Sequence, residues 1–252
     1  MKSRIVLKTS ADVAGIRKSC RLAVRVLGAV RRALTPGVST LELDRVAAEC
    51  IRRAGAEPAP APGFPGSICL SVNETAAHGP PSGYRLEPGD TVCVDVAVRL
   101  RGWCGDAAAS FAAGPADTPT LRLLAAARDA LRAGLRVLRA GGHLGDVGAA
   151  VERVAGERGC VVLAELVGHG IGSELHEDPE VPPTGRPGEG QRIVPGMVLT
   201  LEPALSLGSG RLVAGGDGWS LRTADGARAA QFEHTVAVFR DRTEVLTACA
   251  LY

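Results

Sequence analysis

Apolar residues recur at spacings of three and four near the start of the chain, which is the pattern of one helix face. The face comprises Ile16, Cys20, Val24, Leu27 and Val30. Thr9 and Asp12 have the spacing of a capping box just before it, and Pro36-Gly37 follows it. These signals predict a long helix from residue 10 to about residue 34.

Three more helices are predicted by the same signals. Ser39 and Glu42 form a second capping box before an apolar face that ends near Gly55. Residues 118–140 are rich in Leu, Ala and Arg, and an amphipathic pattern from Leu144 ends near Gly156 or Gly159.

Strand signals occupy the segments between and after these helices. Four prolines in ten residues predict an extended loop without regular structure over residues 57–66. The predicted strands are residues 68–73, 91–100, 103–114, 193–205 and 229–239, and the second and third of these form a hairpin. The order is two helices, strands, two helices, strands. It predicts an α+β fold of two similar halves within one domain, residues 1–252.

Composition narrows the function classes. The chain has 252 residues, a net charge of +2 and only three lysines, with the arginines scattered, so nothing in it calls for nucleic acid or an anionic membrane. Seven cysteines without a CxxC pair argue against a disulfide framework or a structural zinc knuckle and favour reduced thiols in the cytoplasm. Neither a signal peptide nor a transmembrane segment is expected, because the N-terminus lacks the apolar run of the former and no apolar stretch reaches 18 residues without charge.

Four acidic residues stand in apolar, strand-like stretches, where a lone carboxylate is costly unless it is paired or bound to a metal. They are Asp95, Asp106, Glu202 and Glu233. The hairpin could place Asp95 and Asp106 on one face, although an edge strand with Asp95 in water accounts for that residue equally well. Four such acids are hard to explain as solvated surface. Together with histidine they suit divalent ions such as manganese, iron, cobalt or zinc.

Two of the five histidines, His169 and His176, lie in the segment GHGIGSELHEDP. Its glycines argue against a helix, and a glycine-rich bend could bring both rings to one site. The competing interpretation is a surface loop. His78 lies in another loop, NETAAHGPP, while His234 follows Glu233 in a strand and is expected to point to the opposite face.

Six motifs, taken in order, closely resemble those of the methionine aminopeptidases, specifically the short bacterial type I form. They are SVNETAAHG, VDVAV, WCGDAAASF, GHGIGSELHEDP, PGMVLTLEP and QFEHT. The resemblance covers nearly the whole chain, and six ordered motifs are far more specific than one short pattern. It implies the family's pseudo-two-fold pita-bread fold, in which helices flank a curved antiparallel sheet, and this agrees with the duplicated order of elements.

The resemblance also implies two divalent metal ions, of cobalt, manganese, iron or zinc. The positions that match the family's ligands are Asp95, Asp106, His169, Glu202 and Glu233. His78 and His176 match its catalytic histidines, and Glu202 would also act as general base. Four carboxylates and two divalent ions sum to zero charge, so the implied site is nearly neutral when filled and self-repelling when empty.

The implied activity is removal of the N-terminal methionine from nascent or newly made proteins, favouring a small second residue. Metal-activated water would attack the first peptide bond, with His176 stabilising the developing oxyanion and His78 contacting the scissile nitrogen. The implied partners are N-terminal methionines of peptides and of nascent proteins close to the ribosome. The enzyme is expected to be a cytoplasmic monomer without membrane binding or nucleic-acid specificity.

The resemblance also implies an apolar pocket for the methionine side chain. The matching positions are Phe64, Cys69, Leu175 and Trp219. Three residues depart from the family: Ala61 and Pro62 stand where the bacterial form commonly has Tyr and His, and Leu175 stands where Phe is common. A roomier pocket is therefore expected. Backbone carbonyls of Asn73, Thr75 and Ala229 match a monovalent-cation site.

Two alternatives stay open on the sequence. One is an Xaa-Pro aminopeptidase or prolidase of the same fold; these usually carry an additional N-terminal domain. The other is a low-activity paralogue that acts as a binding module, against which the intact set of ligand positions argues.

Overall fold

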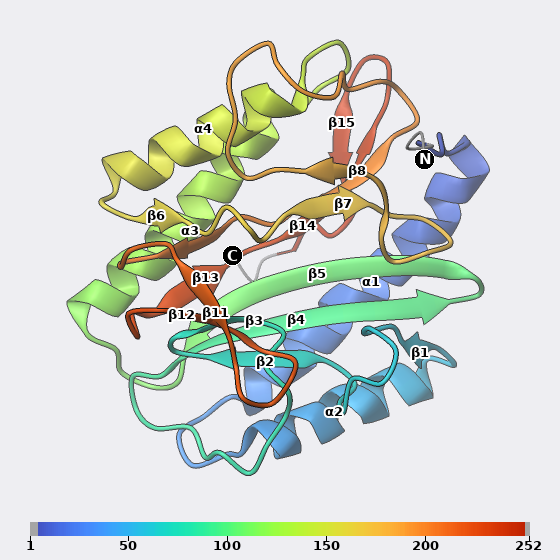
Figure 1. Ribbon diagram of the computed structural model, residues 1–252. Helices are drawn as coiled ribbons and strands as arrows, with labels where there is room; N and C mark the ends of the chain where they lie inside the picture. The colour runs from blue at the N-terminus through green and yellow to red at the C-terminus, as the bar shows by residue number, and fades with distance from the viewer. Residues whose placement is uncertain (1–4, 250–252) are drawn as a thin grey trace.

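This computed structural model describes residues 5–249 of the chain. They contain four helices and fifteen strands (Figure 1). The helices are α1 (Ser10–Ala33), α2 (Thr40–Arg53), α3 (Thr118–Val137) and α4 (Leu144–Glu157). The strands are β1 (Glu57–Pro58), β2 (Cys69–Val72), β3 (Thr75–Ala77), β4 (Thr91–Leu100), β5 (Trp103–Ala112), β6 (Val161–Val162), β7 (Gly168–Gly170), β8 (Glu177–Val181), β9 (Val198–Leu201), β10 (Ala204–Ser206), β11 (Leu212–Ala214), β12 (Leu221–Thr223), β13 (Ala229–Gln231), β14 (His234–Val238) and β15 (Thr243–Val245).

All four predicted helices are present, and their starts are fixed by local hydrogen bonds. The side chain of Thr9 accepts from the Asp12 N–H at the start of α1, and Ser39 does the same for Glu42 at α2. Each acid in return accepts from the backbone N–H of its capping residue. The starts of α3 and α4 agree with the sequence, and α3 ends three residues earlier than predicted.

The central feature is the long hairpin of β4 and β5, with β2 and β1 paired to the other side of β4 (Figure 1). Because β4 has neighbours on both sides, the edge-strand interpretation of Asp95 is wrong. The prediction that residues 57–66 lack regular structure is also wrong at its start, where Glu57 and Pro58 pair with Arg99 and Val98. Proline is tolerated there because β1 is an edge strand.

Two predicted strands are each broken into two shorter ones. The stretch 193–205 holds β9 and β10, which are separated by Glu202 and Pro203. The stretch 229–239 holds β13 and β14, separated by Phe232 and Glu233. The first break occurs because Pro203 has no N–H to donate to a strand ladder. At the second, the Glu233 N–H donates to the carbonyl oxygen of Ala108 in β5. Both breaks fall at acids that the sequence singles out.

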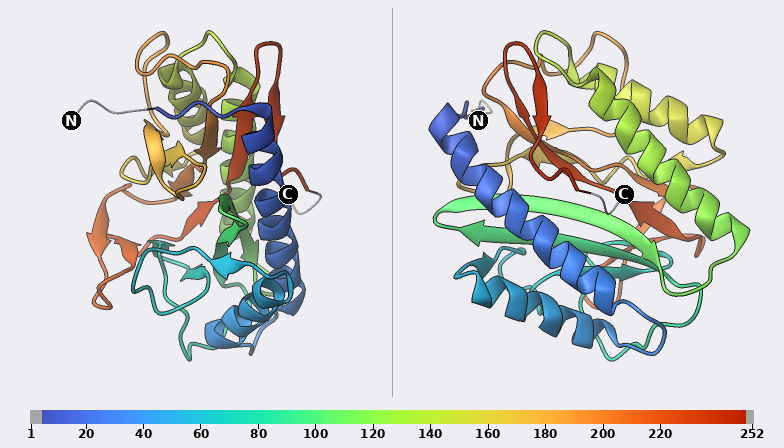
Figure 2. Two further views of the ribbon diagram at one scale, coloured as in Figure 1. Left: turned by 90° about the vertical axis from the view of Figure 1, so that its right-hand side faces the viewer. Right: turned by 180° about the vertical axis from the view of Figure 1, so that it is seen from behind.

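The helices and the strands occupy different sides of the molecule. The two further views show α1 to α4 gathered on one side of the strands, with the loops on the other (Figure 2). A buried apolar core fills the space between helices and sheets, and its members include Leu27 of α1, Leu131 of α3 and Phe232. All seven cysteines are free thiols. None of the helices within residues 5–249 has the length and apolar character needed to cross a bilayer.

Candidate metal centre and active site

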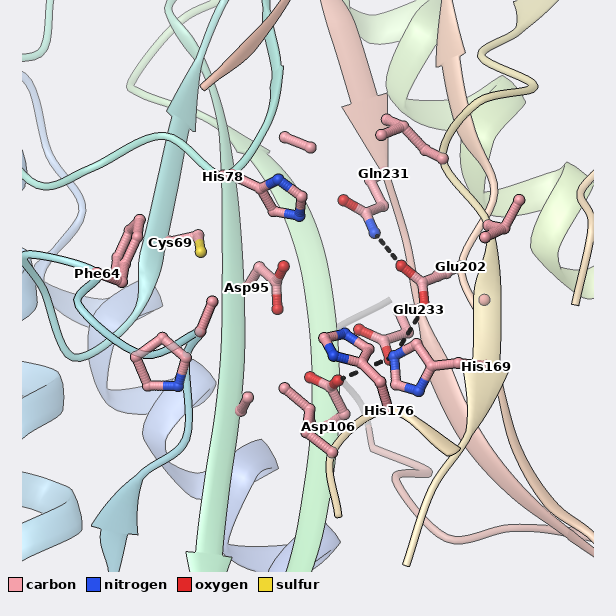
Figure 3. Close-up of a pocket in the computed structure, with 18 of the residues that line it drawn as sticks. Phe64, Cys69, His78, Asp95, Asp106, His169, His176, Glu202, Gln231 and Glu233 are labelled. Atoms are coloured by element: carbon pink, nitrogen blue, oxygen red, sulfur yellow. Dashed lines mark hydrogen bonds and ion pairs between the residues drawn. The ribbon is translucent and has the colours of Figure 1, made fainter. Parts of the chain in front are cut away.

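A cavity of about 810 Å³ opens between the two halves of the strand layer, and a group of acids lies on its wall (Figure 3). Asp95, Asp106 and Glu233 each have a carboxylate oxygen within 4.8 Å of the others. Glu202 lines the same cavity. The four acids come from β4, β5 and the two strand breaks, so residues far apart in the sequence meet at one place.

The hairpin register explains why the first two acids share a face. Asp95 is paired with Ala108, and Asp106 is paired with Ala97, so the two acids are diagonal neighbours. Because side chains alternate between the two faces of a strand, positions 106 and 108 face the same side. The expectation that the hairpin places Asp95 and Asp106 on one face is confirmed.

His169 belongs to β7, is only 8% exposed and lies close to two of the acids. Its Nδ1 is 2.9 Å from the carbonyl oxygen of Gly170, which can only accept, so Nδ1 carries the proton. The lone pair of Nε2 therefore faces Glu202 Oε1 at 3.6 Å and Asp106 Oδ2 at 3.8 Å. Burial, followed by the nearby His176, lowers the His169 pKa to about 4, and the ring is neutral at pH 7. This is the form in which imidazole binds metals.

The acids are held in an environment that opposes their ionisation. Burial raises the pKa of Asp95 to about 6 and that of Glu202 to about 8. The pKa values of Asp106 and Glu233 are also raised, first by burial and then by the charges of the neighbouring acids. Such a cluster is stable as four carboxylates only when cations lie among them.

An unpartnered oxygen of Asp106 is a separate observation that favours a divalent metal at this cluster. Within residues 5–249, Oδ1 of Asp106 is buried and has no hydrogen-bond partner. A buried carboxylate oxygen without a donor is costly, and coordination of a cation would satisfy it. Carboxylate oxygens with one imidazole nitrogen form a donor set suited to first-row divalent ions.

The two other histidines expected at the site border the same cavity (Figure 3). The rings of His176 and His169 meet edge to face, with centroids 4.3 Å apart. The glycine-rich bend thus brings both rings of GHGIGSELHEDP to one place, as one of the two sequence interpretations held. His78 has a left-handed backbone (φ 54°), which is uncommon outside glycine and clusters at functional sites. The fourth histidine near the acids, His234, instead lies 2.8 Å from Thr247 Oγ1.

The glycines beside His169 let β7 pack closely against its neighbours. A Cβ at Gly168 would lie 2.5 Å from the carbonyl oxygen of Thr200 in β9, and one at Gly170 would lie 2.3 Å from that of Asp178 in β8. The close approach is thus to the adjacent strands, and it fixes the backbone from which His169 projects.

Replacing Gly168 with alanine is expected to destabilise the fold by about 1–3 kcal/mol, because the added methyl forces the backbones of β7 and β9 apart. Urea unfolding of the purified protein measures this change. Gly156→Ala is the matched control, since a Cβ at that position in α4 meets nothing within 4 Å. Its free energy of unfolding should be unchanged or slightly raised. Equal stability of the two variants would contradict the packing argument.

Two polar residues at the centre of the site were not predicted from the sequence. Thr200 Oγ1 donates to Glu202 Oε1 at 2.7 Å and accepts from the His169 N–H at 2.9 Å. Gln231 Nε2 donates to Glu202 Oε2 at 3.1 Å. Each stands two residues before an acid, at 202 or 233, and the period of two along a strand was the signal that could have indicated them.

The expected pocket residues also border this cavity. They are Phe64, Cys69, Leu175 and Trp219. The rings of Phe64 and Trp219 pack edge to face, with centroids 5.3 Å apart. Of the two departures in the proline-rich loop, Ala61 lines the cavity, whereas Pro62 is not among its lining residues. Among the positions of the monovalent-cation prediction, the Asn73 carbonyl accepts from the Ala229 N–H at 2.9 Å, and the cation itself stays a prediction.

Comparison with known proteins gives this geometry a family. Residues 14–239 match the model of metallopeptidase family M24. A methionine aminopeptidase of Treponema pallidum is 41% identical over 96% of this chain and 96% of its own length. Methionine aminopeptidase 1 of Bacillus subtilis is 36% identical over 96% of this chain and 99% of its own. The chain belongs to the methionine aminopeptidases of family M24.

Solved structures agree with this assignment. Methionine aminopeptidase from Rickettsia prowazekii superposes with a TM-score of 0.95 at 35% identity, over 97% of this chain and all of that one. Prolidase from Pyrococcus furiosus shares the fold, with a TM-score of 0.77 at 19% identity, and the match covers only 66% of its length. The expected family, pita-bread fold and metallo-exopeptidase class are confirmed. The comparisons favour them over the Xaa-Pro aminopeptidase alternative. Membership in family M24 implies divalent metal ions, with which the carboxylate cluster is consistent.

Proposed function

We propose that this chain removes the N-terminal methionine from peptides and nascent proteins by metal-assisted hydrolysis, favouring a small second residue. The observation that carries the proposal is the meeting of Asp95, Asp106 and Glu233 within 4.8 Å, with a neutral His169 facing the same point. The family supports the reaction class, and the cavity beside the acids supplies room for a peptide end.

Two divalent ions would be held by the five residues named for that role. They are Asp95, Asp106, His169, Glu202 and Glu233. When bound, the ions supply an activated water and polarise the scissile carbonyl. Their identity among manganese, iron, cobalt and zinc depends on availability in the cell, because mixed nitrogen and oxygen ligands accept all four.

Glu202 is the residue that takes the proton from the attacking water. Both of its carboxylate oxygens are oriented by hydrogen bonds, Oε1 from Thr200 and Oε2 from Gln231. Burial raises its pKa to about 8 in the metal-free protein, and bound cations would lower that value, so that the carboxylate is ionised and able to accept a proton. Fixed orientation and suitable basicity are the two requirements of a general base.

His176 and His78 serve the substrate and do not bind metal. His176 lies in contact with the His169 ring but at the exposed rim of the cavity, where its N–H can reach a substrate carbonyl oxygen as negative charge develops. His78, which borders the same cavity, would contact the scissile nitrogen (Figure 3). The apolar wall of Phe64, Leu175 and Trp219 receives the methionine side chain.

The proposal extends to the setting of the reaction. Free thiols at all seven cysteines are typical of a reducing compartment, which supports action in the cytoplasm on chains leaving the ribosome. We propose that the enzyme works there as a monomer.

Turnover of a peptide panel tests the function. Purified protein, loaded in turn with manganese, iron or cobalt, is given Met-Ala-Ser, Met-Leu-Ser and Ala-Pro-Ala. We expect methionine release from the first, much slower release from the second and no cleavage of the third. Cleavage of Ala-Pro-Ala alone would favour the Xaa-Pro alternative. Two tightly bound metal ions without any turnover would favour the binding-module alternative.

The roles of the two adjacent histidines can be separated by substitution. His176→Ala should retain both metal ions and lower kcat by about two orders of magnitude, as expected for the loss of an oxyanion donor. His169→Ala should lose occupancy of one metal, since it removes the only neutral ligand. Metal content by mass spectrometry and kcat on Met-Ala-Ser measure both. Metal loss in His176→Ala, with full occupancy in His169→Ala, would reverse the two assignments.

A further inference from the structure

We propose that Lys8 is a positioning residue for His176: its ammonium holds the Glu177 carboxylate and so fixes the loop that presents the histidine ring. The inference rests on the proposed function, in which His176 serves the substrate. Lys8 precedes α1 and is separated from Glu177 by 169 residues. The start of α1 and the loop between β7 and β8 lie near each other at the right of Figure 1.

The ion pair is buried, unlike the other lysine and arginine pairs in the described part of the chain. Lys8 Nζ lies 2.5 Å from Glu177 Oε2, and the two side chains are only 4% and 11% exposed. The most buried pair after it, Arg17 with Glu244, has side chains 26% and 34% exposed. Exposed pairs contribute little, whereas losing one partner of a buried pair leaves a charge that the interior does not solvate.

Lys8 is held at both ends. Its backbone N–H donates to the carbonyl oxygen of Gly196 at 2.7 Å, just before β9. Its Nζ also donates to the carbonyl oxygen of Val6 at 2.7 Å, which folds the N-terminal segment back on itself. Val6 lines the cavity. The ammonium is therefore a fixed point that ties the N-terminal segment to the wall of the active site.

Glu177 connects Lys8 to the loop that carries His176. It is paired with Gly170 across β7 and β8, and it follows His176 directly. Its second carboxylate oxygen, Oε1, accepts from the Glu174 N–H at 3.3 Å, and the Glu174 carbonyl accepts from the Gly172 N–H at 3.0 Å. One carboxylate thus bonds to the lysine with one oxygen and to the turn of the loop with the other.

The lack of a side chain at Gly172 makes room for the Lys8–Glu177 pair. A Cβ there would lie 2.4 Å from Lys8 Cε and 2.5 Å from Glu177 Oε1. Without the ammonium, the Glu177 carboxylate would be left buried with a backbone N–H as its donor, so it turns toward water and releases Glu174. The loop then loses the constraint on its turn, and His176 loses its fixed orientation.

The expected effect falls on the chemical step. Because His176 acts on charge that develops in the transition state, misplacing it lowers kcat and leaves KM nearly unchanged. Lys8→Met keeps the apolar stem and removes the charge. It should lower kcat on Met-Ala-Ser about ten-fold, less than complete loss of the ring, with KM changed less than two-fold. Lys18→Met is the matched control, because Lys18 is exposed on α1 and has no ion pair among residues 5–249.

Hydrogen exchange of residues 172–177 provides a readout that does not depend on activity. In Lys8→Met the amides of this segment should exchange at least ten-fold faster than in the wild-type protein, while Lys18→Met leaves them unchanged. Glu177→Gln keeps the side-chain volume and removes the other charge, so it should change exchange and kcat in the same direction. It replaces Lys8→Met if that variant does not fold.

A double-mutant cycle shows whether the lysine acts through the histidine. In the His176→Ala background, Lys8→Met should have no further effect on kcat. Unchanged exchange in the loop, a change confined to KM, or a full ten-fold loss in the His176→Ala background would each overturn the proposal. Faster loop exchange in a protein whose wild type releases no methionine would instead show that the proposed function has failed while the structural link holds.

Discussion

Asp106→Asn is expected to lower kcat/KM for methionyl peptides by about three orders of magnitude, equal to ~4 kcal/mol of transition-state stabilisation. Asp106 lies near the other acids and near the histidine. It has a carboxylate oxygen within 4.8 Å of Asp95 and Glu233, and its Oδ2 is 3.8 Å from His169 Nε2. Asparagine keeps the shape but contributes no charge to a bound cation. Metal occupancy and peptide turnover, measured on the same preparation, test the prediction.

The fold of the Asp106→Asn variant should survive, and this separates lost chemistry from lost structure. In the metal-free protein, like charges from Asp95 and Glu202 raise the Asp106 pKa after burial has done so. Asparagine is neutral at this buried position without having to bind a proton, so the metal-free variant should unfold at an equal or higher temperature than the metal-free wild type. Asp241→Asn, an exposed acid outside the site, is the control. Full activity with both metal ions in Asp106→Asn would remove this residue from the ligand set.

Metal removal is expected to destabilise the protein, and more so as the pH rises from 6.5 to 8. An ordinary glutamate has lost its proton in this range, and so has Glu202 in the unfolded chain. In the folded metal-free protein the Glu202 pKa is about 8, so the proton is largely retained until the pH approaches that value. The folded state then binds more protons than the unfolded state, and stability falls with rising pH by about 1.4 kcal/mol per pH unit for each such proton.

Histidines oppose this trend only weakly, and mainly at the lower end of the window. The pKa values of His169 and His234 are lowered to about 4 by burial, so both are neutral above pH 6.5 in the folded state. Burial also lowers the pKa values of His78 and His176. In the unfolded chain a histidine is about half-protonated at pH 6.5 and has lost nearly all of that proton at pH 8. These histidines therefore add an opposite trend that is weak near pH 6.5 and grows below it, because a lowered histidine pKa makes stability rise with pH. The acids therefore dominate only in the upper range.

Bound metal should reverse the trend, because its ligands must be deprotonated. At a free metal concentration about 100-fold above Kd, binding to the folded state alone adds ~2.7 kcal/mol, or about 5–11 °C in the melting temperature for a chain of this size. Thermal melts with and without chelator, at pH 6.5 and 8, measure both effects. Glu202→Gln should weaken the pH dependence of the metal-free protein and leave the part due to Asp106 and Glu233, whose pKa values are also raised. A metal-free wild type equally stable at both pH values would contradict the assignment.

Local signals in the sequence predicted the elements of the fold well. Capping boxes at Thr9 and Ser39 gave the helix starts because their hydrogen bonds form within four residues. The β4–β5 hairpin was predicted from strand periodicity, and with it the possibility that Asp95 and Asp106 share a face. The register of the two strands, which the sequence left open, decides that they do. The breaks at Glu202 and Glu233 were missed, since apolar runs continue past both acids. Pro203 was the local signal for the first break, whereas the second is shown only by the tertiary hydrogen bond from the Glu233 N–H to Ala108 of β5.

The sequence by itself determined which residues are unusual, namely acids in apolar strands and histidines among glycines, and its ordered motifs indicated the family. The tertiary structure decided which of them meet. It brought Asp95 and Glu233 together across 138 positions, added Thr200 and Gln231 as the groups that orient Glu202, and paired Lys8 with Glu177. The physical reason is range. Helix caps and strand faces depend on neighbours a few residues away, whereas a cluster of buried charges exists only after distant strands have packed.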